Sequence, residues 1–360
     1  MKVTCQNISL LFPNQPNFTL QNGKHNDGTE EDKSSAVWTW RYRGFLRIHS
    51  ESGFECGVEC GREVESRSRE EKCKLPDQPI AEVVSLFPDL LESLLMKYAV
   101  LSCPHKIATT YDYIICAHKA ILPGLDPNDF RSVADMDTTF VILQNGVGNE
   151  EPFRSAFPYC SIVSCVIWVG ATQDSPGVIR HTASEHTDIG LYPNPRIDAE
   201  VEEARLEGFA AMLRAGETPY TISDDIQVKR WEKVVWNVAW NPLTTLTMQD
   251  TQQWLSSSKE SVSVTKRLMR EVIGVARRSG VALEYGLVDI LMERIQGMPG
   301  IESSMQVDAR EGRRLEVDVI LGTPMRKARE YGMDVPTLAT VYALTVAVDM
   351  RIKQVLGGLG

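Results

Sequence analysis

Three apolar stretches define the fold class of this 360-residue chain: YDYIICA (111–117), TTFVILQNG (138–146) and SIVSCVIWVGA (161–171). They are rich in β-branched residues with almost no polar interruption, which is typical of strands buried on both faces. The intervening segments, DPNDFRSVADMD and NEEPFRSAFP, each predict a short crossover helix. Strand, helix and strand in this order predict a right-handed parallel α/β unit.

The chain changes character near residue 195. The segment YPNPRIDAE is proline-rich and polar, and the next stretch, AEVEEARLEGFAAMLRAGE, is helical in composition with Gly216 as its expected end. Beyond it, most of the chain predicts long helices, at 224–249, 259–279, 316–331 and 337–356. We therefore expect two domains, an α/β domain over residues 1–195 and a mainly α-helical domain over residues 196–360.

The first 105 residues or so are atypical for the start of an α/β domain. They contain no apolar strand followed by a glycine turn and a helix. The segments HNDGTEEDKSS and REVESRSREEKCK are rich in charge, which predicts solvated or disordered chain. A helix over about 80–98 is plausible from composition.

Composition argues against nucleic-acid and membrane partners. A formal net charge of -10 opposes binding to polyphosphate, and the apolar runs are much shorter than the roughly 20 residues that span a bilayer. The apolar patch in MKVTCQNISLLFPNQ is too short for a secretory leader, so we expect a cytoplasmic protein. Cys116, Cys160 and Cys165 lie in apolar runs and predict buried reduced thiols, while Cys56 and Cys60 fit no common zinc spacing.

Residues at the ends of the predicted strands are candidates for ligand binding, because ligands of open parallel sheets bind beyond the carboxyl ends of the strands. Lys119 follows the first stretch, and Asn145 follows the second. Gly146 and Gly148 would let the backbone approach a ligand closely. The alternative is a plain asparagine-glycine turn into the next helix.

The stretch RWEKVVWNVAWNPLTTLT (230–247) places three polar residues on one face of an apolar helix. Lys233, Asn237 and Asn241 recur every fourth residue. Burying a lysine or an amide without partners costs several kcal/mol, so a substrate pocket is one explanation of the pattern. The other is a partly exposed face whose amides bond to neighbouring helices. Pro242 is expected to disturb the helix near this place.

A second polar cluster lies in ESSMQVDAREGRRLEVDVILG (302–322). Ser303 and Ser304 predict a helix start, and Gly312 permits a bend before Glu316. Such a bend is needed if Ser304 and Glu316 are to converge. The alternative for Glu316 is a solvated carboxylate paired to a neighbouring arginine.

The chain contains three sequence blocks: LQNGVGNEE, WEKVVWNVAWNPLT and SSMQVDAREGRRLEVD. Together they resemble the signature blocks of ketopantoate reductases (2-dehydropantoate 2-reductases), in matching order and with similar separations. The resemblance extends from about residue 111 to the C-terminus. It implies a Rossmann-type domain that binds NADPH and a helical domain that closes over it. The implied activity is NADPH-dependent reduction of ketopantoate or a similar small 2-keto acid, in pantothenate biosynthesis. The resemblance also allows a homodimer through the helical domain.

On the substrate side, the resemblance makes Lys233 the catalytic lysine, with Asn237 and Asn241 as amides that hold the substrate. Ser304 resembles the serine that contacts the substrate carboxylate, and Glu316 resembles the glutamate near the substrate hydroxyl and the cofactor. An ammonium held against the keto oxygen can stabilise developing charge and donate a proton. For that role the pKa of Lys233 should fall, which burial favours and Glu316 opposes.

On the cofactor side, Asn145 matches the asparagine where nicotinamide and substrate meet, and Lys119 and Ala171 resemble cofactor-side positions. The sequence also departs from the family. No GxGxxG motif occurs, and Thr251 and Leu321 stand where asparagines are usual. The alternatives to a working reductase are a non-catalytic member that keeps the substrate cleft without binding the dinucleotide, and a truncated reading of an active gene.

Overall fold

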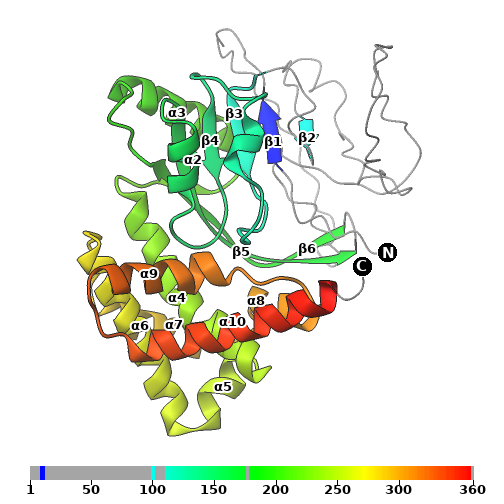
Figure 1. Ribbon diagram of the computed structural model, residues 1–360, viewed down its shortest axis with the longest axis vertical. Helices are drawn as coiled ribbons and strands as arrows, with labels where there is room; N and C mark the ends of the chain where they lie inside the picture. Colours follow the sequence, from blue (N-terminus) through cyan, green and yellow to red (C-terminus); the bar gives the residue numbers. More distant parts are fainter. Residues whose placement is uncertain (1–8, 13–98, 102–109, 176–177, 358–360) are drawn as a thin grey trace, which may run out of the picture.

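The computed structural model describes residues 9–12, 99–101, 110–175 and 178–357 (Figure 1). Among these, a seven-stranded sheet with its covering helices forms one layer and a group of helices forms a second layer beneath it. The expected helix at 80–98 and the two charge-rich segments lie outside the described residues.

The sheet has the strand order β2-β1-β3-β4-β5-β6-β7. Its centre is formed by β3 (Tyr113–Cys116), β4 (Thr139–Ile142) and β5 (Ser161–Ser175), which are mutually parallel as predicted. On one side, β1 (Ser9–Phe12) pairs antiparallel with both β3 and β2 (Ala99–Leu101). The alternating burial faces of the central strands form two apolar clusters, one on each side of the sheet.

Only one of the two predicted crossover helices is an α-helix in the structure. The second is α2 (Glu150–Ala156), as expected. The first is only a 3-10 turn, η2 (Pro127–Phe130), and not an α-helix. Asp126 caps this turn, but the chain beyond it forms a second turn, in which Thr138 bonds to the backbone of Asp135 and Tyr111.

A long antiparallel hairpin was not predicted. The strand β5 continues to Ser175, beyond the end of its apolar run, and pairs with β6 (Val178–Leu191). The register shifts around Gly170, and the hairpin extends past the rest of the sheet alongside the helical layer (Figure 1).

The sheet layer continues past the boundary expected near residue 195. Helix α3 (Ala199–Ala215) ends at Gly216 as predicted, and its Leu206 and Phe209 pack against the sheet. The strand β7 (Tyr220–Ile222) then joins the sheet parallel to β6. We therefore place the change of layer between β7 and the next helix.

The second layer is mainly helical, as predicted. Its elements are α4 (Ile226–Thr247), α5 (Thr251–Ser257), α6 (Lys259–Arg278), α7 (Leu287–Gln296), α8 (Ser304–Arg310), the π-helix η3 (Asp318–Gly322), α9 (Thr323–Glu330) and α10 (Pro336–Gly357).

Helix α4 is the centre of this layer, and it contacts β5, α6, α8 and α10. It runs unbroken through Pro242, so the expected disturbance does not end the helix. Trp231, Val234, Val238 and Trp240 of this helix are almost fully buried in the main apolar cluster. In the part of the chain that the structure describes, no helix combines the length and apolarity needed to cross a membrane.

Candidate active site

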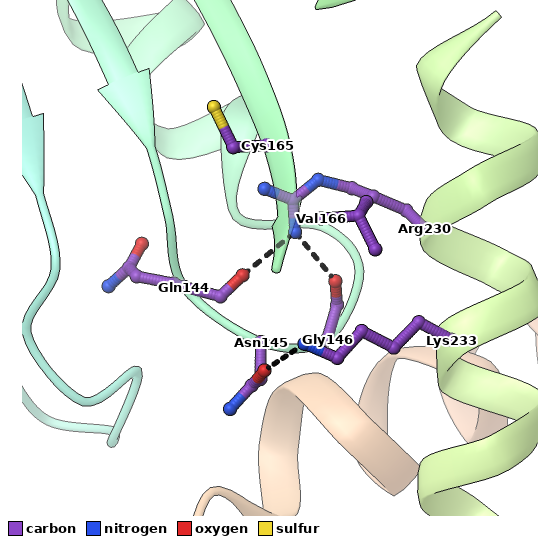
Figure 2. A pocket seen from close by; sticks show the side chains of 7 residues that line it. All are labelled: Gln144, Asn145, Gly146, Cys165, Val166, Arg230 and Lys233. Carbon is purple, nitrogen blue, oxygen red and sulfur yellow. Dashed lines mark hydrogen bonds between the residues drawn. The ribbon is translucent and has the colours of Figure 1, made fainter. Parts of the chain in front are cut away.

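Lys233 extends from α4 toward the loop that follows the carboxyl end of β4 and toward the middle of β5 (Figure 2). Its ammonium nitrogen donates to Asn145 Oδ1 at 2.9 Å and also to the carbonyl oxygen of Ile167 on β5. The ring of Trp168 lies 5.7 Å from the same nitrogen. The lysine is thus enclosed between the two layers, with two fixed acceptors.

Asn145 lies in the loop between β4 and α2, where a glycine backbone is required. Gly146 has φ +89°, and a Cβ there would lie 2.5 Å from the carbonyl oxygen of Val319 in η3. That carbonyl accepts from Val147 N at 3.0 Å, and Asn149 Nδ2 donates to the carbonyl of Asn145 at 2.8 Å. The asparagine-glycine pair is therefore more than a simple turn, because it joins the sheet layer to η3.

Glu316 is 5% exposed and lies at the same junction, so it is not the solvated carboxylate of the alternative interpretation. It accepts from Ala120 N at 3.1 Å, Lys119 Nζ at 3.3 Å and Asn145 Nδ2 at 3.5 Å. Lys119 also donates to Asp308 Oδ2 at 2.8 Å. Asn145 thus connects Lys233 to Glu316, and Glu316 connects Asn145 to Lys119.

The two lysines of this network have opposite pKa shifts. Burial, aided by the charge of Arg230, lowers the pKa of Lys233 to about 8, although Glu316 and Asp188 act in the raising direction. For Lys119 burial also acts to lower the pKa, but the charges of Glu316 and Asp308 outweigh it and the pKa is raised. Lys233 can therefore exchange a proton near neutral pH, whereas Lys119 stays a fixed cation.

Asn237 and Asn241 follow Lys233 on the same face of α4, and they are 7% and 6% exposed. Among the described residues, neither side-chain amide takes part in a hydrogen bond, so neither follows the alternative in which neighbouring helices satisfy them. Although these residues are largely buried, their amide atoms are not among the buried polar atoms that lack a partner, so solvent reaches them and each can bond to water or a ligand. Both amides are therefore available to a ligand on the same face of α4 as Lys233.

The predicted helix start at Ser303 and Ser304 is present. Ser303 caps α8 by accepting from Gln306 N, and its hydroxyl lies 2.7 Å from that of Thr244. Ser304 is the first residue of α8 and is exposed. Gly312 has φ +69° and makes the expected bend before Glu316. Ala171 lies farther along β5, paired with His181, and no contact among the described residues links it to Lys233.

Several residues of the site were missed from the sequence. Asp308 is buried and holds Lys119, and Arg230 is buried one turn before Lys233. Arg230 could have been found from the same feature that identified Lys233, which is a charged residue on the buried side of an apolar helix. His118 is also buried, its Nδ1 has no hydrogen-bond partner among the residues that the structure describes, and burial lowers its pKa to about 4.

No cluster of metal-ligating side chains was found among the described residues, whereas Cys116, Cys160 and Cys165 are buried free thiols as predicted. The strand-end loop, the proton-exchanging lysine and the unpartnered amides lie where an α/β layer meets a helical layer. The described residues thus form an α/β layer and a mainly helical layer, and the candidate site lies at their junction.

Two family models describe the chain in succession: "Ketopantoate reductase PanE/ApbA" matches residues 55–194, and "Ketopantoate reductase PanE/ApbA C terminal" matches residues 225–349. The chain belongs to the ketopantoate reductase family. The first match begins in the part of the sequence that the structure does not describe.

Individual relatives are distant. An uncharacterized protein of Saccharomyces cerevisiae is 26% identical over 68% of this chain and 74% of its own length. The crystal structure of 2-dehydropantoate 2-reductase from Methylococcus capsulatus is 28% identical with a TM-score of 0.62, over 70% of this chain and 79% of that one. A D-mandelate dehydrogenase with NADH and anilino(oxo)acetate shares the fold at 22% identity, with a TM-score of 0.60 over 68% and 77%.

Proposed function

We propose that this protein reduces 2-dehydropantoate (ketopantoate), or a similar small 2-keto acid, to the 2-hydroxy acid with NADPH. The observation that carries the proposal is the state of Lys233, a lysine enclosed between the domains with its pKa lowered to about 8. It has two hydrogen-bond acceptors, and the amides of Asn237 and Asn241, which make no hydrogen bond among the described residues, follow it along the same helix. That arrangement suits a proton donor to a carbonyl oxygen.

In the proposed reaction, each residue of the site has a separate role. Lys233 places its ammonium against the keto oxygen, stabilises the charge that develops there and donates the proton. Asn237 and Asn241 supply amides to the substrate, and Ser304 at the start of α8 supplies a hydroxyl to its carboxylate. Asn145 orients the lysine through the 2.9 Å bond to its Oδ1. This bond fixes the direction in which the ammonium faces the substrate.

Residues that would hold the nicotinamide end of the cofactor fit that role in type and place. Lys119, Asn145 and Glu316 offer an ammonium, an amide and a carboxylate beyond the carboxyl ends of β3 and β4. Such a set can bond both the oxygen and the nitrogen of a carboxamide. When bound, the nicotinamide would supply the hydride. Ala171, on the distal half of β5, is the cofactor-side position with least structural support.

Cofactor binding is tested first. The purified chain is titrated with NADPH and with NADH, following cofactor fluorescence, and ketopantoate is then added. We expect binding below millimolar NADPH and oxidation of the cofactor when the keto acid is present. Absence of binding at millimolar cofactor contradicts the proposal and favours a family member that keeps the cleft without the dinucleotide.

The role of Lys233 is tested by Lys233→Ala. Loss of the proton donor is expected to lower kcat about a hundredfold or more with little change in the Kd of NADPH. Lys229→Ala is the matched control, since Lys229 lies one turn earlier on α4 and pairs with Glu232 at the surface. Equal loss of NADPH binding in Lys233→Ala would mean that the lysine is structural.

Two further properties follow from this proposal. A ketopantoate reductase would serve pantothenate biosynthesis in the cytoplasm, and we propose a homodimer formed through the helical domain. Sedimentation velocity at two protein concentrations tests the second point. A monomer at both concentrations would contradict it.

A further inference from the structure

Arg230 is a buried arginine at the junction of the two layers, outside the residues that face the proposed substrate. It is 2% exposed and lies on α4, one turn before Lys233. Burial of a guanidinium costs several kcal/mol unless its donors and its charge are compensated. The groups that bond to this guanidinium therefore indicate which part of the structure Arg230 stabilises.

Three of these partners are backbone carbonyls of one segment. The guanidinium donates to the carbonyl oxygens of Ile142, Gln144 and Gly146, each at 2.9 Å (Figure 2 draws the last two). Ile142 ends β4, and the other two carbonyls belong to the residues on either side of Asn145. The fork of the arginine thus holds the loop that carries Asn145.

The remaining contacts compensate the charge. Arg230 Nε lies 2.7 Å from Glu150 Oε1 and also contacts Ser164 Oγ on β5. Glu150 is 1% exposed and accepts from Ser164 at 2.7 Å and from Gln227 Nε2 at 3.1 Å. An ion pair alone would need only the arginine and the glutamate. The three carbonyl bonds are additional, and they go to the end of β4 and to the two residues that flank Asn145.

We propose that Arg230 is a positioning residue for the reaction, which holds the Asn145 loop against α4 so that Asn145 and Lys233 keep a fixed separation. This inference builds on the proposed function. Arg230 and Lys233 lie on one helix, so the element that presents the lysine also fixes its partner amide. A misplacement of about 1 Å in such a pair can cost a hundredfold in rate. The positive charge of Arg230 also helps lower the pKa of Lys233.

The test is Arg230→Lys, which keeps the charge but cannot form the fork of carbonyl bonds. We expect amide hydrogen exchange in residues 143–149 to rise about tenfold, because the loop loses its backbone partners. In turnover, kcat should fall tenfold or more, with the KM for the keto acid and the Kd of NADPH changed less than about threefold. Arg214→Lys, in an exposed pair with Glu207, is the control and should change none of these.

A second measurement can be made whether or not the protein has enzymatic activity. Acetylation of Lys233 by acetic anhydride, followed by peptide mass spectrometry across pH, reports its titration. The midpoint should stay unchanged in Arg230→Lys and rise in Arg230→Gln/Glu150→Gln, which removes the charge together with its partner. If the unmutated protein reduces no keto acid, the proposed function fails, while exchange and acetylation still decide the role of Arg230.

Unchanged exchange in residues 143–149 of Arg230→Lys would overturn the proposal. So would unchanged kcat in that variant if the unmutated enzyme is active. If Arg230→Lys does not fold, Arg230→Gln/Glu150→Gln replaces it, because this variant removes the carbonyl bonds without leaving Glu150 as an unpaired buried charge. A severalfold rise in loop exchange is then expected, and no rise overturns the proposal.

Discussion

Two lysines lie in one hydrogen-bonded network, and only one of them is suited to transfer a proton. Lys119 lies between the carboxylates of Asp308 and Glu316, which raise its pKa. Lys233 has amide and carbonyl oxygens as hydrogen-bond acceptors, and burial lowers its pKa to about 8. Identical side chains thus acquire different chemistry from the charge of their acceptors.

The lowered pKa of Lys233 predicts how the rate of the proposed reaction depends on pH. A proton donor must be protonated, so kcat for reduction should fall as pH rises through about 8. Glu316 acts to raise the pKa of Lys233, so Glu316→Gln should move this fall to lower pH. Pre-steady-state reduction rates at a series of pH values provide the measurement, with the exposed Glu232→Gln as the control. A fall displaced to higher pH would show that Glu316 does not stabilise the charged lysine.

At the scale of elements, the contact between the β4–α2 loop and η3 fixes the site. Gly146 has positive φ, and a Cβ at this position would clash with the backbone of Val319. A left-handed φ strains any residue with a Cβ, and the close approach adds a steric clash. Gly280 separates the two effects, because it has a similar φ of +86° and no atom within 4 Å of the position that a Cβ would occupy.

Gly146→Ala should therefore destabilise the protein more than Gly280→Ala. Strain at positive φ alone costs about 1 kcal/mol, and the clash with Val319 is expected to bring the total to roughly 3 kcal/mol. Denaturant unfolding of both variants gives the comparison, and kcat should fall only in Gly146→Ala. Equal stability losses would mean that the loop moves away from η3 at no cost.

For the whole molecule, Lys119 connects the two layers by charge. It follows β3 in the sheet layer, and its carboxylate partners Asp308 and Glu316 belong to the helical layer and are 4% and 5% exposed. Removing one partner from buried ionic groups leaves uncompensated charge, which is more costly than loss of a surface pair.

Lys119→Met is expected to lower the free energy of unfolding by about 3 kcal/mol. Lys266→Met, which breaks the exposed pair with Asp289, should lower it by less than about 1 kcal/mol. Urea unfolding measures both variants. Lys119→Met/Glu316→Gln should recover part of the loss, because it removes the charge of Glu316, whereas Asp308 keeps its pair with Arg313. No recovery would place the cost in lost packing instead of charge.

Local sequence specifies the elements and the faces they present. Unbroken β-branched runs defined β3, β4 and the first part of β5, and the spacing of Lys233, Asn237 and Asn241 placed them on one face of α4. The bend at Gly312 was readable because few residues other than glycine adopt positive φ. These features depend on interactions within a few residues.

Which faces meet depends on tertiary packing. Lys119 and Asp308 are 189 residues apart, and nothing local to either indicates the other. The return of β6 along β5, and the packing of α3 and β7 on the sheet, likewise depend on distant partners. The periodicity of apolar residues determines which side of each helix or strand is buried. Which other element covers that side depends on how all the elements pack together. The charges at the junction acquire their pKa values only when that packing excludes water.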